Sequence, residues 1–588
     1  MLEALSDFKI ENIIDFLEKD RFTPFTAFVY LIILGVIRSV SESLYFEYPM
    51  FSMYLVAQHI AFNLPVLVLG VLVIQKATET SMKKVFNVVL LGFWITALPP
   101  FIDKFLFGLS GYEYSAMYSY YAGYEGALFI EKLAMIVPTH LLAAEHISPG
   151  LRFMIFSIVV FSVFYIIVKL DLHKLKVIKS KLNRRMIIKK IAAVFFGFFG
   201  IWLVVWFITA SVPSVISFEG DRIIILDFIR TNMSPEYYFF FSEYGYSIEA
   251  GSEVFPGTGS NTIGLAHGTV IQQRSLLITM YFTILTAFSF LGTLYRANKQ
   301  MLKKILKTVN TPLVYLTTLL ALLGNGVLFQ LDGGFSKGWA IDPTYPLHIP
   351  YIFYILIIGF FLGCFAIFID RVFNPDKVDD TDRLSIYHNK KLAIVSFLAV
   401  ASFSFLMGPF NTFPIAMVFM ATIFLISIIS EDISGLPKVL RFSMIGIFSF
   451  FLGFYTPGIW KSVIWTVRDN VPDPETFTTI DLTRNPPITG FIIGVVVVMF
   501  ITLLILGYVS QILEKDKFPL DYPVSYALLP VFFLPSLVFY DLTLFVIFAV
   551  LGSVSITFMD DDPDVVLKIL ALQIVCILLW LWGMIPSI

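Results

Sequence analysis

Long apolar stretches constrain this chain more than any other feature of its sequence. A helix that crosses a bilayer needs roughly 17–25 mostly apolar residues. The first half of the chain contains six such stretches, at 26–46, 52–75, 84–102, 152–169, 190–212 and 274–295. The second half contains nine, at 312–330, 349–369, 390–408, 411–430, 438–457, 489–512, 523–539, 541–558 and 565–586. The sequence therefore predicts an all-α polytopic integral membrane protein with about 15 transmembrane helices.

The composition agrees with this class. Of the 588 residues, 57% are apolar and 14% are charged, whereas soluble globular domains carry about 25% charged residues. The net charge of −2 supplies no basic field for nucleic acid. Cys364 and Cys576 both lie inside apolar stretches, which argues against a disulfide framework or a cysteine zinc site. A soluble multidomain enzyme and a nucleic-acid partner are therefore not expected.

Basic residues in short loops predict how the chain is oriented, because Lys and Arg concentrate in cytoplasmic loops. Nine of them lie within 169–190, and the loop 296–307 carries five more. The segment 213–273 has only Arg222 and Arg230 against seven acidic residues, which predicts an extracytoplasmic insert. The N-terminus is then cytoplasmic, and the predicted location is the plasma membrane of a prokaryote.

The N-terminal half is predicted to contain two parts. Residues 1–25 have apolar side chains at helical spacing, which is typical of an amphipathic helix that lies at the membrane interface or packs on neighbouring loops. Residues 26–300 form a membrane module that includes the insert. Within it, charged and histidine side chains interrupt 126–148, which predicts a re-entrant or interfacial stretch. This half is loosely similar to Yip1-like membrane domains, through the segment Arg38-Ser-Val-Ser-Glu42.

Ionisable groups inside apolar stretches are expensive in a bilayer, so each is a candidate for function. Arg38 and Glu42 are four residues apart and could pair on one helix face. His59 lies in the next stretch, with Asn63 one turn later. These residues favour either a polar transport pathway or simple hydrogen bonding between helices.

Two acidic loops follow the second and the sixth apolar stretches of the second half, and both are predicted to face the cytoplasm. The first runs from Asp370 to Arg383, and the second contains Glu514-Lys-Asp-Lys517. Carboxylates from both loops could hold Mg²⁺, which prefers oxygen ligands and can bridge to a diphosphate. Lysine and arginine beside them could bind phosphate oxygens directly.

Residues 301–588 resemble the UbiA superfamily of intramembrane prenyltransferases. The segment Asp370-Arg-Val-Phe-Asn-Pro-Asp-Lys377 is similar to the end of the first family motif, and Glu514-Lys-Asp-Lys517 with Pro523-Val524 is similar to the second. The resemblance implies a nine-helix bundle and transfer of a prenyl group from a prenyl diphosphate to a lipid or aromatic acceptor.

The resemblance also implies roles for individual residues. Those implied to be catalytic are Asp370, Asp376 and Asp516. Those implied to bind Mg²⁺ are Asp370, Asp379, Asp380, Glu514 and Asp516. Those implied to bind the diphosphate are Asn374, Lys377, Arg383, Lys515 and Lys517.

The chain departs from the family pattern at two positions. Leu362 and Ala366 stand where the first motif has Asn and Asp. This departure favours an alternative, in which the UbiA-like unit binds lipid or organises the membrane without catalysis. A transporter is the third possibility. The expected partners are membrane lipids or a prenyl diphosphate.

Overall fold

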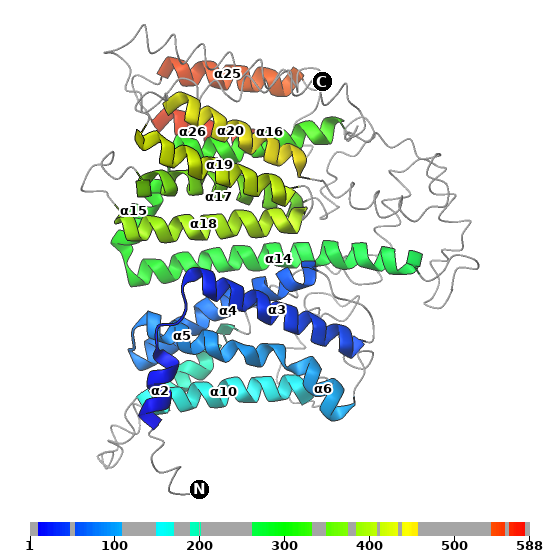
Figure 1. Cartoon of the computed structure of the whole chain (residues 1–588), viewed down its shortest axis with the longest axis vertical. Coiled ribbons are helices and arrows are strands. Elements are labelled where there is room, and N and C mark those ends of the chain that lie inside the picture. Colours follow the sequence, from blue (N-terminus) through cyan, green and yellow to red (C-terminus); the bar gives the residue numbers. More distant parts are fainter. Residues whose placement is uncertain are drawn as a thin grey trace, which may run out of the picture. The chain divides into compact units, whose positions relative to one another are not determined.

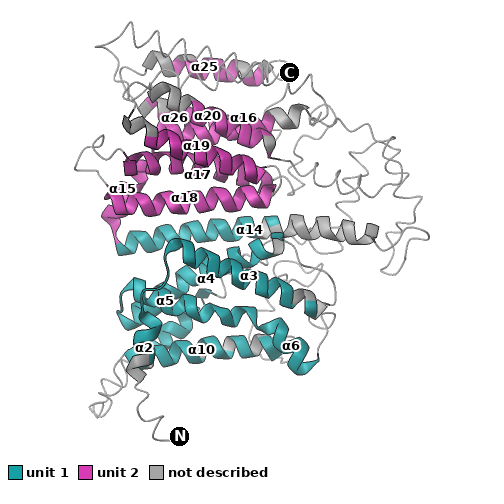
Figure 2. Cartoon of the chain, in the orientation of Figure 1, with its two compact units in different colours: residues 1–297 teal, residues 298–588 magenta. Residues whose placement is uncertain are grey.

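A computed structural model of the chain is shown in Figure 1. It describes residues 10–46, 53–108, 149–169, 188–198, 200–201, 261–331, 349–373, 384–408, 412–432, 438–456, 542–558 and 564–581. All regular secondary structure in these ranges is helical, which confirms the all-α fold class. The chain divides into two compact units, Met1–Ala297 and Asn298–Ile588 (Figure 2).

The first unit is built on a packed set of helices. Its described elements are α2 (Ile10–Glu18), α3 (Pro24–Phe46), α4 (Met53–Thr78), α5 (Met82–Gly92), the 3-10 helix η1 (Phe93–Ala97), α6 (Pro99–Phe107), α10 (Pro149–Lys169) and α14 (Asn261–Ala297). Helix α3 packs on α4 and α6, α14 packs on α4, and α10 packs on α6. Leu34, Leu67, Val85 and Val88 are among the buried residues of the main core cluster.

The second unit is arranged around α16. Its described helices are α15 (Lys299–Val309), α16 (Pro312–Leu331), α17 (Ile349–Phe373), α18 (Ile386–Met407), α19 (Thr412–Asp432), α20 (Lys438–Tyr455), α25 (Leu542–Phe558) and α26 (Asp564–Leu581). Helix α16 packs against α17, α20 and α26, and α17 packs in turn against α18. Because it is enclosed on several sides, α16 buries Leu316, Leu319 and Leu322 completely.

Small residues let α16 and α20 approach closely. A Cβ atom added at Gly324 would overlap the carbonyl oxygen of Phe450, and one added at Gly453 would overlap that of Ala321. Ser449 also donates a hydrogen bond of 2.7 Å to the carbonyl oxygen of Thr317. Such contacts between small residues are typical of helix pairs in membranes, where packing rather than water exclusion drives association.

Several described helices are long and apolar enough to cross a membrane. There are five such candidates: Pro24–Ser41, Val56–Thr78, Met82–Phe107, Pro350–Phe373 and Ile386–Met407. The bent pair Lys299–Val309 and Pro312–Gly326, with 58° between its helices, would raise the count to six. These helices fit a multi-pass membrane protein. The full set of fifteen spans and the nine-helix UbiA-like bundle stay predictions.

Some predicted features lie outside the described residues. They are the stretch 126–148, most of 190–212, and the spans 489–512 and 523–539. Two described segments differ from the sequence prediction. Residues 299–309, treated as part of a basic loop, form helix α15, and α14 begins at Asn261, inside the predicted insert 213–273.

Candidate functional sites

Of the residues in the predicted prenyl-diphosphate site, the structure describes one. Asp370 lies in the last turn of α17 and is half-buried. The others lie outside the described residues: Asn374, Asp376, Lys377, Asp379, Asp380, Arg383, Glu514, Lys515, Asp516 and Lys517. Mg²⁺ is usually bound by one or two carboxylates together with substrate phosphates. Asp370 would supply one of these ligands. No group of three metal-ligating side chains occurs among the described residues.

The residue after Asp370 fixes the end of α17. Arg371 donates a hydrogen bond of 2.8 Å from Nη1 to the hydroxyl of Thr308, at the end of α15. Thr308 itself is buried and donates back to the carbonyl oxygen of Lys304. This contact joins α15 to α17 next to the acidic loop that begins at Asp370.

The face of α17 that leads to Asp370 is packed against α16. Residues 359, 363, 366 and 370 recur at helical spacing, so they share one face. A Cβ atom at Gly359 would lie 2.9 Å from the carbonyl oxygen of Thr317, and one at Gly363 would overlap the Thr317 hydroxyl. Ala366 is 3% exposed. Helix α16 therefore fills the space beside this face.

Leu362 lies beside that face and is fully buried. Together with Ala366 it occupies the positions at which the family pattern has polar ligands. At both positions the structure has apolar side chains inside a helix bundle. Neither residue can hold a metal ion or a phosphate group, because neither side chain carries a polar atom.

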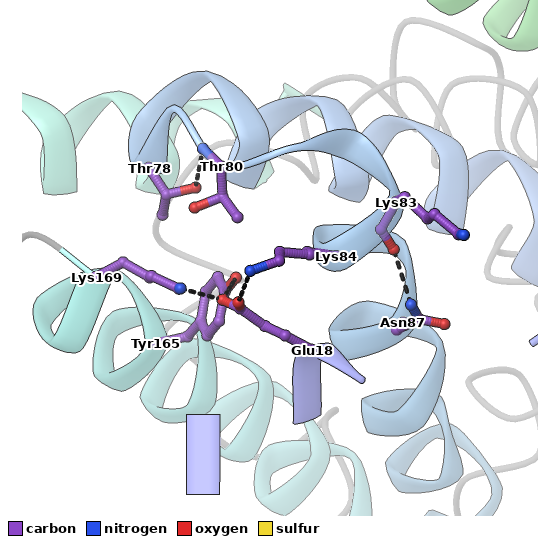
Figure 3. Close-up of polar contacts among 8 residues, drawn as sticks. All are labelled: Glu18, Thr78, Thr80, Lys83, Lys84, Asn87, Tyr165 and Lys169. Carbon is purple, nitrogen blue, oxygen red and sulfur yellow. Dashed lines mark hydrogen bonds and ion pairs between the residues drawn. The ribbon is translucent and has the colours of Figure 1, made fainter. Parts of the chain in front are cut away.

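A second polar site lies at the end of α2, where three helices meet. Figure 3 shows the side chains of Glu18 from α2, Lys84 from α5, and Tyr165 and Lys169 from α10. The Tyr165 hydroxyl donates to the carboxylate of Glu18 at 2.9 Å, and the Lys84 ammonium lies 3.1 Å from the other carboxylate oxygen. The Lys169 ammonium forms an ion pair with the same oxygen that Tyr165 contacts. Glu18 is 5% exposed.

These contacts set the charge of Glu18. Burial by itself would raise the pKa of its carboxyl group, since a low-dielectric surrounding disfavours the charged form. The hydrogen bonds from Lys169, Tyr165 and Lys84 favour the carboxylate and outweigh burial, so the pKa lies below its ordinary value. Glu18 is thus ionised at neutral pH, one carboxylate facing two ammonium groups.

Helix α2 is packed against the rest of the first unit. Helix α2 packs on α5, and Ile14 is part of the core cluster of this unit. Helix α2 thus packs on other helices of its unit, and its contact with the membrane interface stays a prediction. The sequence analysis missed Glu18. The available signal was an acidic residue four positions after Ile14, on the apolar side of the helix.

A third polar site lies where the span Met82–Phe107 is interrupted. In a continuous α-helix the carbonyl oxygen of Thr96 would accept a hydrogen bond from the amide four residues later. That residue is Pro100, which has no N–H group. The Arg38 guanidinium supplies the missing donor, because its Nη1 atom lies 2.9 Å from the Thr96 carbonyl oxygen. Arg38 is buried on α3. The side chain of Glu42, its predicted partner, lies outside the described residues.

The far end of the interrupted span also has a buried polar contact. Asp103 on α6 is fully buried and accepts a hydrogen bond of 2.7 Å from the backbone amide of Gly150. Gly150 lies in the first turn of α10, where free amide groups and the helix dipole favour a carboxylate. A Cβ atom at Gly150 would overlap the carbonyl oxygen of Pro99. This contact couples α6 to α10.

Helix α4 carries three buried polar side chains within two turns. Gln58, His59 and Asn63 all lie on the N-terminal side of Pro65, which interrupts the helix hydrogen bonding. Asn63 is the nearest of the three to the proline, two positions before it. The described residues are thus helical, their long apolar helices fit a multi-pass membrane protein, and the first unit contains buried polar sites.

No protein family, no curated protein and no solved structure matches this chain. The likeness of residues 301–588 to the UbiA superfamily stays a prediction.

Proposed function

We propose that the second unit is a UbiA-like module that binds or organises membrane lipid without transferring a prenyl group. The observation that separates this proposal from prenyl transfer is the contact between α16 and the face of α17 that leads to Asp370. Gly359 and Gly363 bring the two backbones together, and Ala366 follows on the same face. A prenyl chain and its diphosphate need open space and polar ligands at this place.

The test compares lipid binding with catalysis. Full-length protein is purified in mild detergent and incubated with Mg²⁺ and labelled geranylgeranyl diphosphate. We expect lipid to co-purify and diphosphate release to stay at the level without Mg²⁺. Asp370→Ala and Asp516→Ala are expected to retain the bound lipid. Mg²⁺-dependent release that both substitutions abolish would overturn the proposal and establish a divergent prenyltransferase.

A second candidate function, transport, is favoured by the interrupted span of the first unit. Interrupted helices in transporters expose backbone groups to substrates or ions near the middle of the membrane. Here Arg38 binds such a freed carbonyl group, and buried ionisable residues inside a membrane often mark a transport pathway. The test measures uptake of labelled ions or metabolites into proteoliposomes. Uptake by the wild-type protein that is lost in Glu42→Gln would support transport. Wild-type uptake no greater than that of empty liposomes would reject it.

A further inference from the structure

Helix α15 separates basic and apolar residues cleanly. Its sequence KQMLKKILKTV contains four lysines and no acidic residue. At 100° per residue, Lys299, Lys303, Lys304 and Lys307 fall on one side of the helix. Met301, Leu302, Ile305, Leu306 and Val309 fall on the other side. This is the pattern of a helix that lies at a membrane surface.

The structure holds α15 at a defined angle to α16. Its axis is bent by 58° from that of α16, with the break at Asn310 and Thr311 just before Pro312. The side chain of Asn298 caps its first turn, accepting 2.9 Å from the amide of Met301. Arg371 binds Thr308 in its last turn. With α16 along the membrane normal, a bend of 58° brings α15 closer to the membrane plane than to the normal.

The exposed surface of α15 has both chemistries that a lipid interface requires. Lys299, Lys303 and Lys307 are exposed. Leu306, at the edge of the apolar side, is 52% exposed, whereas Leu302 is packed against the protein. An exposed leucine next to exposed ammonium groups fits the boundary between acyl chains and phosphate headgroups.

We propose that α15 lies in the cytoplasmic interface of the membrane and binds anionic phospholipid headgroups through its lysine face. The abundance of lysine and arginine in this segment places it in the cytoplasm by the positive-inside rule. Cytoplasmic leaflets carry negative lipids, and each lysine near such a surface strengthens attraction about fivefold. The proposal stands whether or not the second unit is catalytic.

The experiment measures lipid preference in the full-length protein. Purified protein is reconstituted in nanodiscs of phosphatidylcholine and phosphatidylglycerol, and spin-labelled analogues of both lipids report their relative association. We expect wild type to prefer phosphatidylglycerol about fivefold or more at low salt, since several lysines contribute. The preference should fall as salt rises.

The variants separate α15 from general basic charge. The triple variant Lys299→Gln, Lys303→Gln and Lys307→Gln is expected to lose most of the preference. A matched triple variant removes three exposed lysines of the first unit, Lys19→Gln, Lys76→Gln and Lys189→Gln, and is expected to retain it. Replacement of the three α15 lysines by arginine should also retain it, because the charge is kept.

Three results would overturn the proposal. The first is an unchanged preference in the α15 triple variant. The second is an equal loss in the matched triple variant, which would indicate a diffuse charge effect. The third is loss of the preference when about 10 mM inorganic phosphate is added at constant ionic strength. Phosphate at this concentration competes for a site that binds small anions, but not for a lipid surface.

Discussion

The hydroxyl of Tyr165 donates a hydrogen bond of 2.9 Å to the carboxylate of Glu18, across 147 positions of sequence. This contact joins α10 to the short N-terminal helix α2. Glu18 is buried and is also paired with Lys84 and Lys169. A nine-residue helix is marginal by itself in water. Helix α2 therefore depends on this polar site and on Ile14 for its place in the first unit.

Substitution of Glu18 tests this dependence. We expect Glu18→Gln to weaken the docking of α2 by about 1–3 kcal/mol, because a buried charged hydrogen-bond partner is removed while both lysines remain. Amide hydrogen exchange of residues 10–18 in the full-length protein measures the change.

The control for Glu18 is an acidic residue with an exposed ion pair. Asp20 pairs with Lys83, and their side chains are 55% and 66% exposed. We expect Asp20→Asn to change the exchange of α2 by less than about 1 kcal/mol, as is usual for surface pairs. Equal effects of the two substitutions would show that burial of Glu18 contributes nothing to the docking.

Acidification gives a second test of the same site. The pKa of Glu18 is lowered in the folded state, so its contribution is fully present above the ordinary pKa of a glutamate, about 4.3. The contribution is lost as pH falls below this value through the folded pKa. Protection of α2 should thus be constant from about pH 7 to pH 5.5 and decline toward pH 3. In wild type, the protection of α2 should decline more at low pH than the protection of neighbouring helices. In Glu18→Gln this excess decline should be absent.

Sequence reasoning located helices well where a long apolar stretch determines them. The stretch 349–369 corresponds to α17 (Ile349–Phe373), and 26–46 corresponds to α3 (Pro24–Phe46). The length of a bilayer span explains this success, since it leaves few alternatives for twenty apolar residues. The same reasoning predicted one continuous span over 84–102. The structure interrupts that span at Phe93–Ala97, just before Pro99 and Pro100.

The polar sites were harder to predict because they combine distant residues. The partners of Glu18 come from two other helices, and no local pattern links position 18 to position 165. The predicted pairing of Arg38 with Glu42 lies outside the described residues, whereas the hydrogen bond from Arg38 to the Thr96 carbonyl oxygen joins two elements that no local pattern links. Helix α15 was visible in the spacing of its leucine and lysine residues, but its lysines were used only to assign topology. The acidic loops lie mostly outside the described residues.

The contact between Arg38 and Thr96 predicts a specific energetic coupling to Pro100. Arg38→Gln should lower the free energy of unfolding by about 1.5–3 kcal/mol, because a hydrogen bond to a charged donor is lost. In a Pro100→Ala background, an amide can replace the guanidinium donor, so the same substitution should cost about half as much. Thermal unfolding of the four proteins in detergent gives the coupling energy.

Other contacts of Arg38 would contribute equally in both backgrounds of this cycle and cancel. Arg38→Lys keeps the charge but loses the planar donor geometry, and we expect an intermediate cost. A coupling energy of zero would mean that the guanidinium does not serve as the donor that Pro100 lacks.

The packing of α16 on α17 predicts that Gly359 cannot accept even one methyl group. In Gly359→Ala the new Cβ would lie 2.9 Å from the Thr317 carbonyl oxygen, the Thr318 Cα and the Ala321 Cβ. Two of these are backbone atoms that cannot move alone, so we expect a loss of about 1–3 kcal/mol. The matched control is Gly292→Ala on α14, where nothing lies within 4 Å. There the gain in helix propensity should make the protein equally or slightly more stable.

The pair of glycine substitutions also bears on function. If α16 and α17 are in close contact, Gly359→Ala lowers the unfolding temperature in detergent while Gly292→Ala does not. If both variants unfold at the wild-type temperature, α17 has room beside Gly359 for a prenyl chain that runs along the helix toward Asp370. In that case the proposal of a non-catalytic lipid-binding unit loses its main support, and the prenyltransferase prediction is favoured instead.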